Sequence, residues 1–190
     1  MKTIPQIIHQ IQSINELKDF VLVAIDGRGG SGKTTCALLI KHKIPDADII
    51  TTDDFLNDEL HKIDINQLEL RVLIPFSKGK SAKYLEFDGQ KREERIVKPK
   101  GVVIIEGIYS SHSSLKNYYD MTIWVKAEDV DKKVEKRDGF YDEDWEKYHR
   151  PNENEYITED RPQDRANYII NNVQNESLNN LKLLWEKVCG

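Results

Sequence analysis

The sequence has few cysteines, no long apolar run and no excess of positive charge. Its 190 residues include two cysteines, Cys36 and Cys189. These have neither the spacing of metal ligands nor the context of a disulfide framework. No apolar run is long enough to span a bilayer, and no basic segment followed by an apolar one begins the chain. We therefore expect a soluble, cytoplasmic protein with no membrane partner.

The charge balance argues against a nucleic-acid-binding protein. The chain has 33 Asp and Glu against 28 Lys and Arg, a formal net charge of -5, whereas nucleic-acid binding favours a basic face. A small anionic ligand is still compatible with this balance, because a local cluster of cations can hold it. The sequence shows no internal repeat, and nothing in it indicates an oligomeric state. We expect residues 1–190 to form one domain.

Short apolar runs alternate with stretches of helical periodicity. Five runs predict buried strands, the last of them short: 20–25, 47–50, 101–107, 121–127 and 167–170. Helical spacing is found between or beside them, at 4–14, 33–43, 64–72, 130–134 and 178–188. This alternation predicts an α/β protein of three layers, in which helices cover both faces of a mostly parallel sheet.

Two polar segments interrupt this alternation. Residues 77–100 contain Asp88-Gly89, a turn signal, and predict a small hairpin excursion from the main sheet. Residues 137–162 are strongly charged and carry Trp145, Tyr148 and Tyr156. They predict a helical lid, and the alternative is a solvated pair of charged helices.

A glycine-dense turn joins the first predicted strand to the helix that follows. The stretch AIDGRGGSGKTT (24–35) fits the pattern G-x-x-x-x-G-K-[ST] of a phosphate-binding loop. Its glycines let successive N–H groups point inward, and the helix directs the positive end of its dipole to the same spot. We expect Lys33 to reach the phosphates of a nucleotide and the Thr34 hydroxyl to ligate Mg²⁺. The predicted nucleotide-binding residues are Gly27, Arg28, Gly29, Gly30, Ser31, Gly32, Lys33, Thr34 and Thr35.

Three acids follow the ends of predicted strands, namely Asp26, Asp53 and Glu106. Because the carboxyl ends of parallel strands lie at one edge of a sheet, we expect these acids to lie together. Phosphoryl transfer to a hydroxyl needs a positioned carboxylate and a magnesium site. We predict that Asp53 is the base, with Asp54 as the alternative, and that Glu106, Asp53 and Thr34 hold Mg²⁺. A structural role, as a cap or a surface acid, is the alternative at each position, and the role of Asp26 stays open.

These residues resemble those of the uridine kinase and phosphoribulokinase group of P-loop kinases, and in particular of bacterial uridine kinase-like proteins. The phosphate loop is similar, and TTDDFL (51–56) resembles the stretch whose Asp acts as the base, which implies Asp53. VVIIEGIYS (102–110) resembles the strand that ends in Glu-Gly, which implies Glu106. The resemblance implies ATP and Mg²⁺ as cofactors, with Lys33, Asp53 and Arg137 as catalytic residues.

Further likenesses concern the acceptor side. HKIDINQL (61–68) resembles the segment that supplies an Asp to the sugar, which implies Asp64. That residue can equally cap its own helix, with Gln67 at the capping-box position. KYLEFD (83–88) resembles the hairpin region whose tyrosine and phenylalanine hold a nucleobase, which implies Tyr84 and Phe87.

The predicted lid also resembles that of the same group. KKVEKRD (132–138) is similar to its beginning, where Arg137 matches an arginine that folds over the phosphates. DWEKYHRPNENEYI (144–157) is similar to the rest, with Trp145, Glu153 and Tyr156 at matching places. The further lid candidates are Arg150, Tyr156 and Arg161.

The implied activity is ATP-dependent phosphoryl transfer to a hydroxyl of a small molecule, the ribose of a uridine- or cytidine-like nucleoside. One alternative keeps the kinase and changes the acceptor to pantothenate, nicotinamide riboside or a sugar phosphate. A second alternative is a P-loop ATPase or nucleotide-binding switch with no small acceptor. The sequence lacks the Asn-Lys-x-Asp motif with which switch GTPases read guanine.

Overall fold

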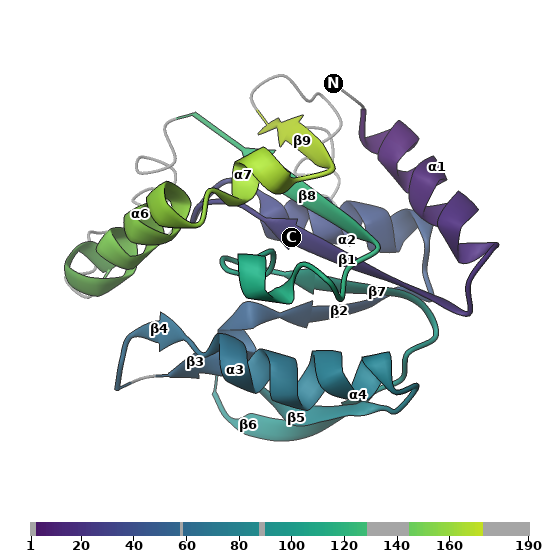
Figure 1. The fold of residues 1–190 in the computed structure, drawn as a ribbon, viewed down its shortest axis with the longest axis horizontal. Helices are drawn as coiled ribbons and strands as arrows, with labels where there is room; N and C mark the ends of the chain where they lie inside the picture. The colour runs from purple at the N-terminus through teal and green to yellow at the C-terminus, as the bar shows by residue number, and fades with distance from the viewer. Residues whose placement is uncertain (1–2, 58, 88–89, 129–144, 173–190) are drawn as a thin grey trace.

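The central feature of the structure is a parallel sheet of five strands (Figure 1). The structure is a computed structural model that describes residues 3–57, 59–87, 90–128 and 145–172. The strands lie in the order β2-β7-β1-β8-β9 and are formed by the five apolar runs of the sequence. Their bounds are β1 Phe20–Asp26, β2 Asp48–Thr51, β7 Gly101–Glu106, β8 Met121–Lys126 and β9 Tyr168–Asn171.

Helices cover both faces of this sheet. On one face, α1 (Ile4–Asn15) and α2 (Lys33–Lys43) bury their apolar sides against Val21, Val23 and Ile25 of β1. On the other face, the helical run Ile65–Ser77, composed of α3 (Ile65–Leu68), η2 (Glu69–Leu73) and α4 (Ile74–Ser77), packs against Leu22. Alternate residues of β1 therefore enter separate cores, as expected for a strand between two helical layers. The expected three-layer α/β architecture is confirmed.

The helical run on the second face continues past the point where the sequence suggested it would end. Pro75 lacks an N–H and its ring crowds the preceding turn, so we expected the helix to stop before it. The turn just before it, Glu69–Leu73, is a π-helix, and Pro75 then lies in the first turn of α4. Proline is tolerated in the first turn of a helix, where its missing N–H would have no partner within the helix, so the helical run extends to Ser77.

Two hairpins extend from the sheet. The predicted excursion forms β5 (Ala82–Phe87) and β6 (Arg92–Val97), which pair antiparallel. A second, smaller hairpin of β3 (Leu56–Asn57) and β4 (Lys62–Ile63) was not predicted, because strands of two residues leave no periodicity to detect. It follows η1 (Thr52–Phe55), a single 3-10 turn after β2. A further 3-10 turn, η3, spans Ser113–Leu115.

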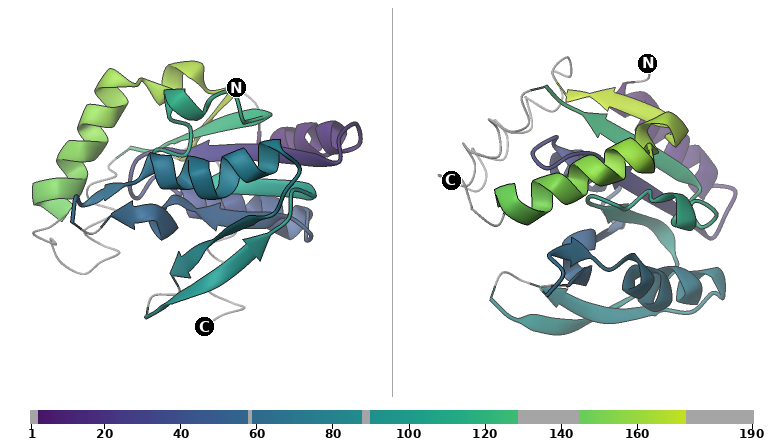
Figure 2. Two further views of the ribbon diagram at one scale, coloured as in Figure 1. Left: turned by 60° about the horizontal axis from the view of Figure 1, so that its bottom comes forward. Right: turned by 60° about the vertical axis from the view of Figure 1, so that its left-hand side comes forward.

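The described part of the predicted lid is helical. It consists of η4 (Trp145–His149) and α6 (Arg150–Glu159), and α7 (Pro162–Arg165) leads from it to β9 (Figure 2). Within the ranges that the structure describes, no helix combines the length and apolar character that crossing a membrane requires. Several predictions of the sequence lie outside the described residues: Arg137, Cys189, the turn 88–89 and the helices at 130–134 and 178–188.

Candidate active site at the phosphate loop

Two positions beside the candidate site have room only for glycine. Gly27, the first residue of the loop, has φ 152°, and a β-carbon there would lie 2.4 Å from the Val125 carbonyl oxygen. Gly107, directly after β7, has φ 133°, and a β-carbon would lie 1.9 Å from Oγ1 of Thr52. The backbone therefore approaches β8 at Gly27 and the turn after β2 at Gly107 more closely than any side chain allows.

Lys33 begins α2 and turns back over the loop. Its Nζ donates a hydrogen bond to the Arg28 carbonyl oxygen at 2.9 Å, and the same oxygen accepts the Ser31 N–H at 3.1 Å. The ammonium group thus lies at the mouth of the loop, where the amides and the helix N-terminus favour negative charge. A phosphate oxygen could replace the carbonyl as its partner.

The two predicted magnesium ligands on β7 and α2 are in contact. The Thr34 hydroxyl donates to Oε1 of Glu106 at 3.0 Å, and Glu106 is only 6% exposed. Burial raises the pKa of the Glu106 carboxyl, an effect that the positive charge of Lys33 and the Thr34 hydrogen bond oppose. A buried carboxylate beside a hydroxyl offers the hard oxygen ligands that Mg²⁺ prefers.

The surroundings of this pair fit a magnesium ion that is held jointly with phosphates. Among the described residues, no group of three or more His, Cys, Asp or Glu side chains could hold a metal ion. Protein Mg²⁺ sites commonly use one or two protein oxygens and complete the shell with phosphate and water. Thr34 and Glu106 match such a site, and Asp53 lies close enough for its charge to raise the pKa of Glu106 as a lesser contribution.

The neighbouring acids Asp53 and Asp54 occupy different environments. Asp54 is 5% exposed, and its Oδ1 accepts the Phe87 N–H at 2.9 Å. Its carbonyl oxygen accepts a hydrogen bond from Arg92 at 2.8 Å, so Asp54 attaches η1 to the β5–β6 hairpin. Burial raises the pKa of its carboxyl to about 6. Asp53, by contrast, is exposed, two residues after Thr51, which pairs with Glu106 across the sheet.

The residues predicted on the acceptor side do not come together. Asp64 caps α3, since its Oδ1 accepts the Gln67 N–H at 3.1 Å, so the capping alternative is confirmed and the acceptor role stays a prediction. Tyr84 is buried with its ring 5.3 Å from that of Phe55. Phe87 lies on the opposite face of β5 and is 48% exposed. A single base cannot lie between Tyr84 and Phe87 in this arrangement, because successive residues of a strand point to opposite faces.

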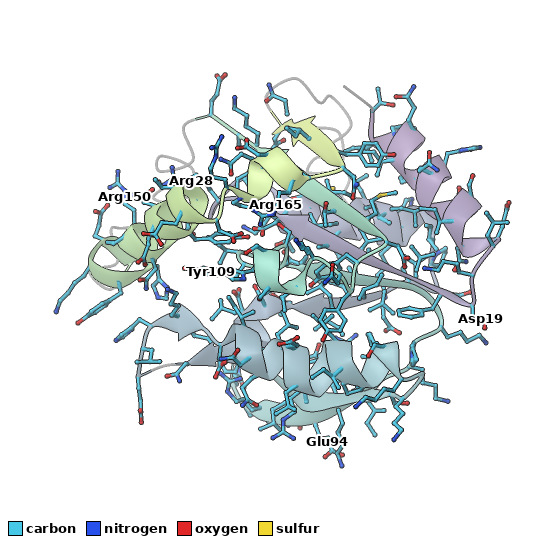
Figure 3. The ribbon with its side chains drawn as sticks, viewed as in Figure 1. Asp19, Arg28, Glu94, Tyr109, Arg150 and Arg165 are labelled. Carbon is cyan, nitrogen blue, oxygen red and sulfur yellow. The ribbon has the colours of Figure 1, made fainter. Side chains whose placement is uncertain are left out.

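The described arginines of the predicted lid pair with acids of their own segment. Arg150 donates to Oε1 of Glu146 at 2.8 Å, and Arg161 lies 2.5 Å from Asp164. The guanidinium that reaches α6 from the loop is that of Arg28, which donates to Oδ1 of Asn154. Figure 3 shows α6 between Arg28 on one side and Tyr109 on the other.

Asp26, whose role the sequence left open, joins three parts of the fold. Its Oδ1 accepts the Gly27 N–H at 2.7 Å. Its Oδ2 accepts the N–H of Ser111 at 3.0 Å, the Ser111 hydroxyl at 2.7 Å and the Tyr156 hydroxyl at 2.6 Å. Complete burial raises the pKa of the carboxyl, although these four hydrogen bonds oppose that rise. Asp26 therefore fixes the phosphate loop to the segment after β7 and to α6.

Tyr156, predicted as a lid residue, is buried in the core, where its hydroxyl donates to Oδ2 of Asp26. Replacing it by phenylalanine should lower the free energy of unfolding by about 1–3 kcal/mol, because a buried carboxylate loses a hydrogen-bond donor. Hydrogen exchange in α6 should rise as well. The matched control is Tyr118→Phe, which removes a hydroxyl bonded to Glu69 at 2.8 Å in a less enclosed place and should cost less. Equal losses in denaturant melts of the two variants would contradict a special role for the Asp26 contact.

Two residues that the sequence did not single out contact the helical segment 145–159, which comprises η4 and α6. Tyr109 and His61 have positive φ angles of 68° and 46°, which residues other than glycine rarely adopt. The Tyr109 hydroxyl donates to the Asn152 carbonyl oxygen at 2.9 Å, and the His61 ring stacks on Tyr148 with centroids 4.1 Å apart. Backbone strain of this kind often marks functional segments. No sequence pattern predicts a positive φ angle at a tyrosine or a histidine, so neither residue could be identified from the sequence.

Comparison with known proteins finds matches among solved structures. No protein-family model and no curated protein matches the chain. A protein described as a possible uridine kinase from Bacillus stearothermophilus has a similar structure, with a TM-score of 0.61 at 15% identity over 87% of this chain and 99% of that one. A protein described as a fructose transport system kinase from Silicibacter sp. reaches 0.52 at 20% identity over 90% and 100%. D-glycerate 3-kinase from Cryptococcus neoformans reaches 0.50 at 12% identity over 79% and 85%.

The chain therefore has the three-layer α/β fold of the P-loop kinases. Within that class, the predicted resemblance to uridine kinase-like and phosphoribulokinase-like proteins is confirmed at the level of the fold. The sequence identities are too low for the comparison to extend to the substrate.

Proposed function

We propose that this protein is a Mg²⁺-dependent kinase that transfers the γ-phosphoryl group of ATP to a hydroxyl group of a small molecule. The observation that carries the proposal is the hydrogen bond between Thr34 of the phosphate loop and Glu106 at the end of β7. It places a phosphate-binding loop and a buried carboxylate at one edge of the sheet, with exposed Asp53 beside them.

In the proposed reaction the loop holds the nucleotide and neutralises its charge. The amides of Gly29, Gly30, Gly32 and Lys33 hold the β-phosphate, and the Lys33 ammonium exchanges the Arg28 carbonyl for phosphate oxygens. Thr34 and Glu106 hold the magnesium ion, which when bound withdraws charge from the phosphate oxygens. These interactions stabilise the charge that spreads over the transferred group in the transition state.

The acceptor side then needs a base. The acceptor oxygen forms a bond to the γ-phosphorus as the bond from that phosphorus to the bridging oxygen of ADP breaks. The Asp53 carboxylate accepts the proton that the hydroxyl loses. Closure of the predicted lid excludes water, which limits hydrolysis of ATP.

For the acceptor, we infer the ribose of a pyrimidine nucleoside. The inference is supported by the sequence resemblance around Asp53, Asp64 and Glu106. The named acceptor of one structurally similar protein, described as a possible uridine kinase, agrees with it. Asp64 follows β4 at the start of α3, and its N–H donates to the Phe55 carbonyl oxygen at 2.8 Å in the turn η1 that carries Asp53.

A screen of acceptors tests the proposal. Purified protein with ATP and Mg²⁺ is given uridine, cytidine, pantothenate, nicotinamide riboside or a sugar phosphate, and ADP release is followed. Release that uridine or cytidine stimulates supports the nucleoside kinase, and stimulation by another compound keeps the kinase and replaces the acceptor. Release that no acceptor changes identifies an ATPase instead. Detection of the phosphorylated product by mass spectrometry separates transfer from stimulated hydrolysis.

A further inference from the structure

A carboxylate of the protein itself binds an amide of the phosphate loop. Glu153 of α6 accepts the Gly29 N–H, with both carboxylate oxygens 3.2 Å from the nitrogen. The side chain is deeply placed, since Glu153 is only 7% exposed. An acid thus faces a loop whose expected ligand is a phosphate.

Positive charge surrounds this carboxylate as it would surround a phosphate. Nε of Arg28 lies 3.9 Å from Oε2 of Glu153. Burial raises the pKa of the Glu153 carboxyl, while the charges of Lys33, Arg28 and His149 and the Gly29 N–H oppose that rise. The groups that would bind a phosphate therefore stabilise the Glu153 anion in its place.

The carboxylate and a phosphate cannot bind this amide together. The Gly29 nitrogen has a single hydrogen, and Glu153 accepts it. A β-carbon built on Gly29 would lie 3.0 Å from Oε1 of Glu153, so the carboxylate also lies close against the backbone of the loop at this residue. Binding of one anion at this amide therefore requires the other to leave.

The position of Glu153 on α6 connects this contact to the anchor of the helix. Tyr156 is three residues further along, on the same face of the helix, and its hydroxyl is bonded to Asp26. The contacts of Glu153 with Gly29 and of Tyr156 with Asp26 therefore hold the same face of α6 against the loop region. Arg28, which contacts both Glu153 and Asn154, becomes available to the nucleotide when Glu153 leaves.

We propose that Glu153 is an internal competitor of the nucleotide, holding α6 on the phosphate loop until phosphates displace it. The proposal rests on the proposed function in one respect, that the loop binds nucleotide phosphates. The measured affinity for nucleotide is then the intrinsic affinity of the loop multiplied by the fraction of molecules in which Glu153 has left the loop. Removing the carboxylate should tighten binding, whereas a merely structural glutamate would leave it unchanged or weaken it.

The test measures the binding of ADP, and separately of inorganic tripolyphosphate, by titration calorimetry. Glu153→Ala removes the acceptor group, and Glu153→Asp keeps the charge but shortens the side chain by one methylene. Both should bind about tenfold more tightly than the wild type, which is about 1.4 kcal/mol. Glu159→Gln is the matched control, because Glu159 lies on the exposed side of the same helix and its loss changes net charge equally. This variant should bind as the wild type does.

The possible results distinguish three cases: an effect of the Glu153 contact with the loop, an effect of its negative charge alone, and a loop that does not bind phosphates. Tighter binding by Glu153→Ala with wild-type binding by Glu153→Asp would overturn the proposal, because charge alone would then explain the effect. Unchanged or weaker binding by both variants would also overturn it. If Glu153→Ala fails to fold in a thermal melt, Glu153→Asp decides alone. Failure of the proposed function looks different: the folded wild type would then bind neither ADP nor tripolyphosphate.

Discussion

Replacing Lys33 by alanine should lower kcat/KM for phosphoryl transfer by about 10³-fold, with the fold intact. Loss of a group that stabilises charge in the transition state typically costs 10²- to 10³-fold or more. The fold should stay intact because Lys33 belongs to neither apolar core, although its loss removes the hydrogen bond to the Arg28 carbonyl oxygen and a positive charge that acts on the Glu106 and Glu153 carboxyls. An assay of ADP release measures the loss of activity, and circular dichroism checks that the fold is intact.

Lys41 provides the matched control for this variant. It lies on the same helix and its Nζ likewise donates to a backbone carbonyl oxygen, that of Ala47 at 2.8 Å. Lys41→Ala therefore removes an equal charge and a similar hydrogen bond from the other end of α2, and turnover should stay near that of the wild type. Full activity of Lys33→Ala, or equal losses in the two variants, would contradict the phosphate-loop mechanism. Lys33→Arg should not restore activity, because a planar guanidinium does not replace a compact ammonium.

The sheet could be predicted from the sequence because burial on both faces leaves a plain signal. Consecutive residues of β1 are apolar, namely Val21, Leu22 and Val23. In the structure, Val21 and Val23 pack in one core and Leu22 packs in the other. The phosphate loop could be predicted because its chemistry requires glycines, a lysine and a hydroxyl at fixed spacing. Both inferences depend on local constraints, which a sequence displays directly.

The organisation of the site could be predicted only in part, because it depends on contacts between distant segments. Asp26 bonds to Tyr156, which is 130 positions away, and Glu153 reaches Gly29 over 124 positions. In the sequence, Asp26 ends an apolar strand and Glu153 lies in a charged segment. Neither position shows a pattern that predicts which distant residue it will contact. The direction of a side chain on a lid is set by how the helix docks, so the contact of Glu153 with the loop could not be predicted from the sequence.

The same limitation explains the ambiguity between the two acids after β2. In the sequence Asp53 and Asp54 are neighbours of equal chemistry. In the structure the 3-10 turn η1 points one carboxyl toward the β5–β6 hairpin and leaves the other exposed. A turn of four residues carries too little pattern for this choice to be made without the hairpin that it contacts.

Asp53→Asn should lower kcat by about 10²- to 10⁴-fold, the range that general-base catalysis supplies. An amide cannot accept the proton that the acceptor hydroxyl loses, although it occupies the same volume. Binding of ADP should change little, because Asp53 is exposed and is not part of the loop that holds the phosphates. Single-turnover kinetics with saturating acceptor separates the chemical step from product release, and calorimetry with ADP checks the binding.

The neighbouring substitution Asp54→Asn distinguishes a base from a structural carboxylate. Asp54 is buried and accepts the Phe87 N–H, so its loss should destabilise the β5–β6 hairpin by about 1–3 kcal/mol and leave most of the turnover of the folded enzyme. Asp53→Asn should thus be recognised by its lower kcat, and Asp54→Asn by its lower free energy of unfolding. Near-normal turnover of Asp53→Asn together with an inactive but folded Asp54→Asn would transfer the base to Asp54. Near-normal turnover of both would leave Glu106, which would then need to be displaced from its hydrogen bond with Thr34 to accept a proton.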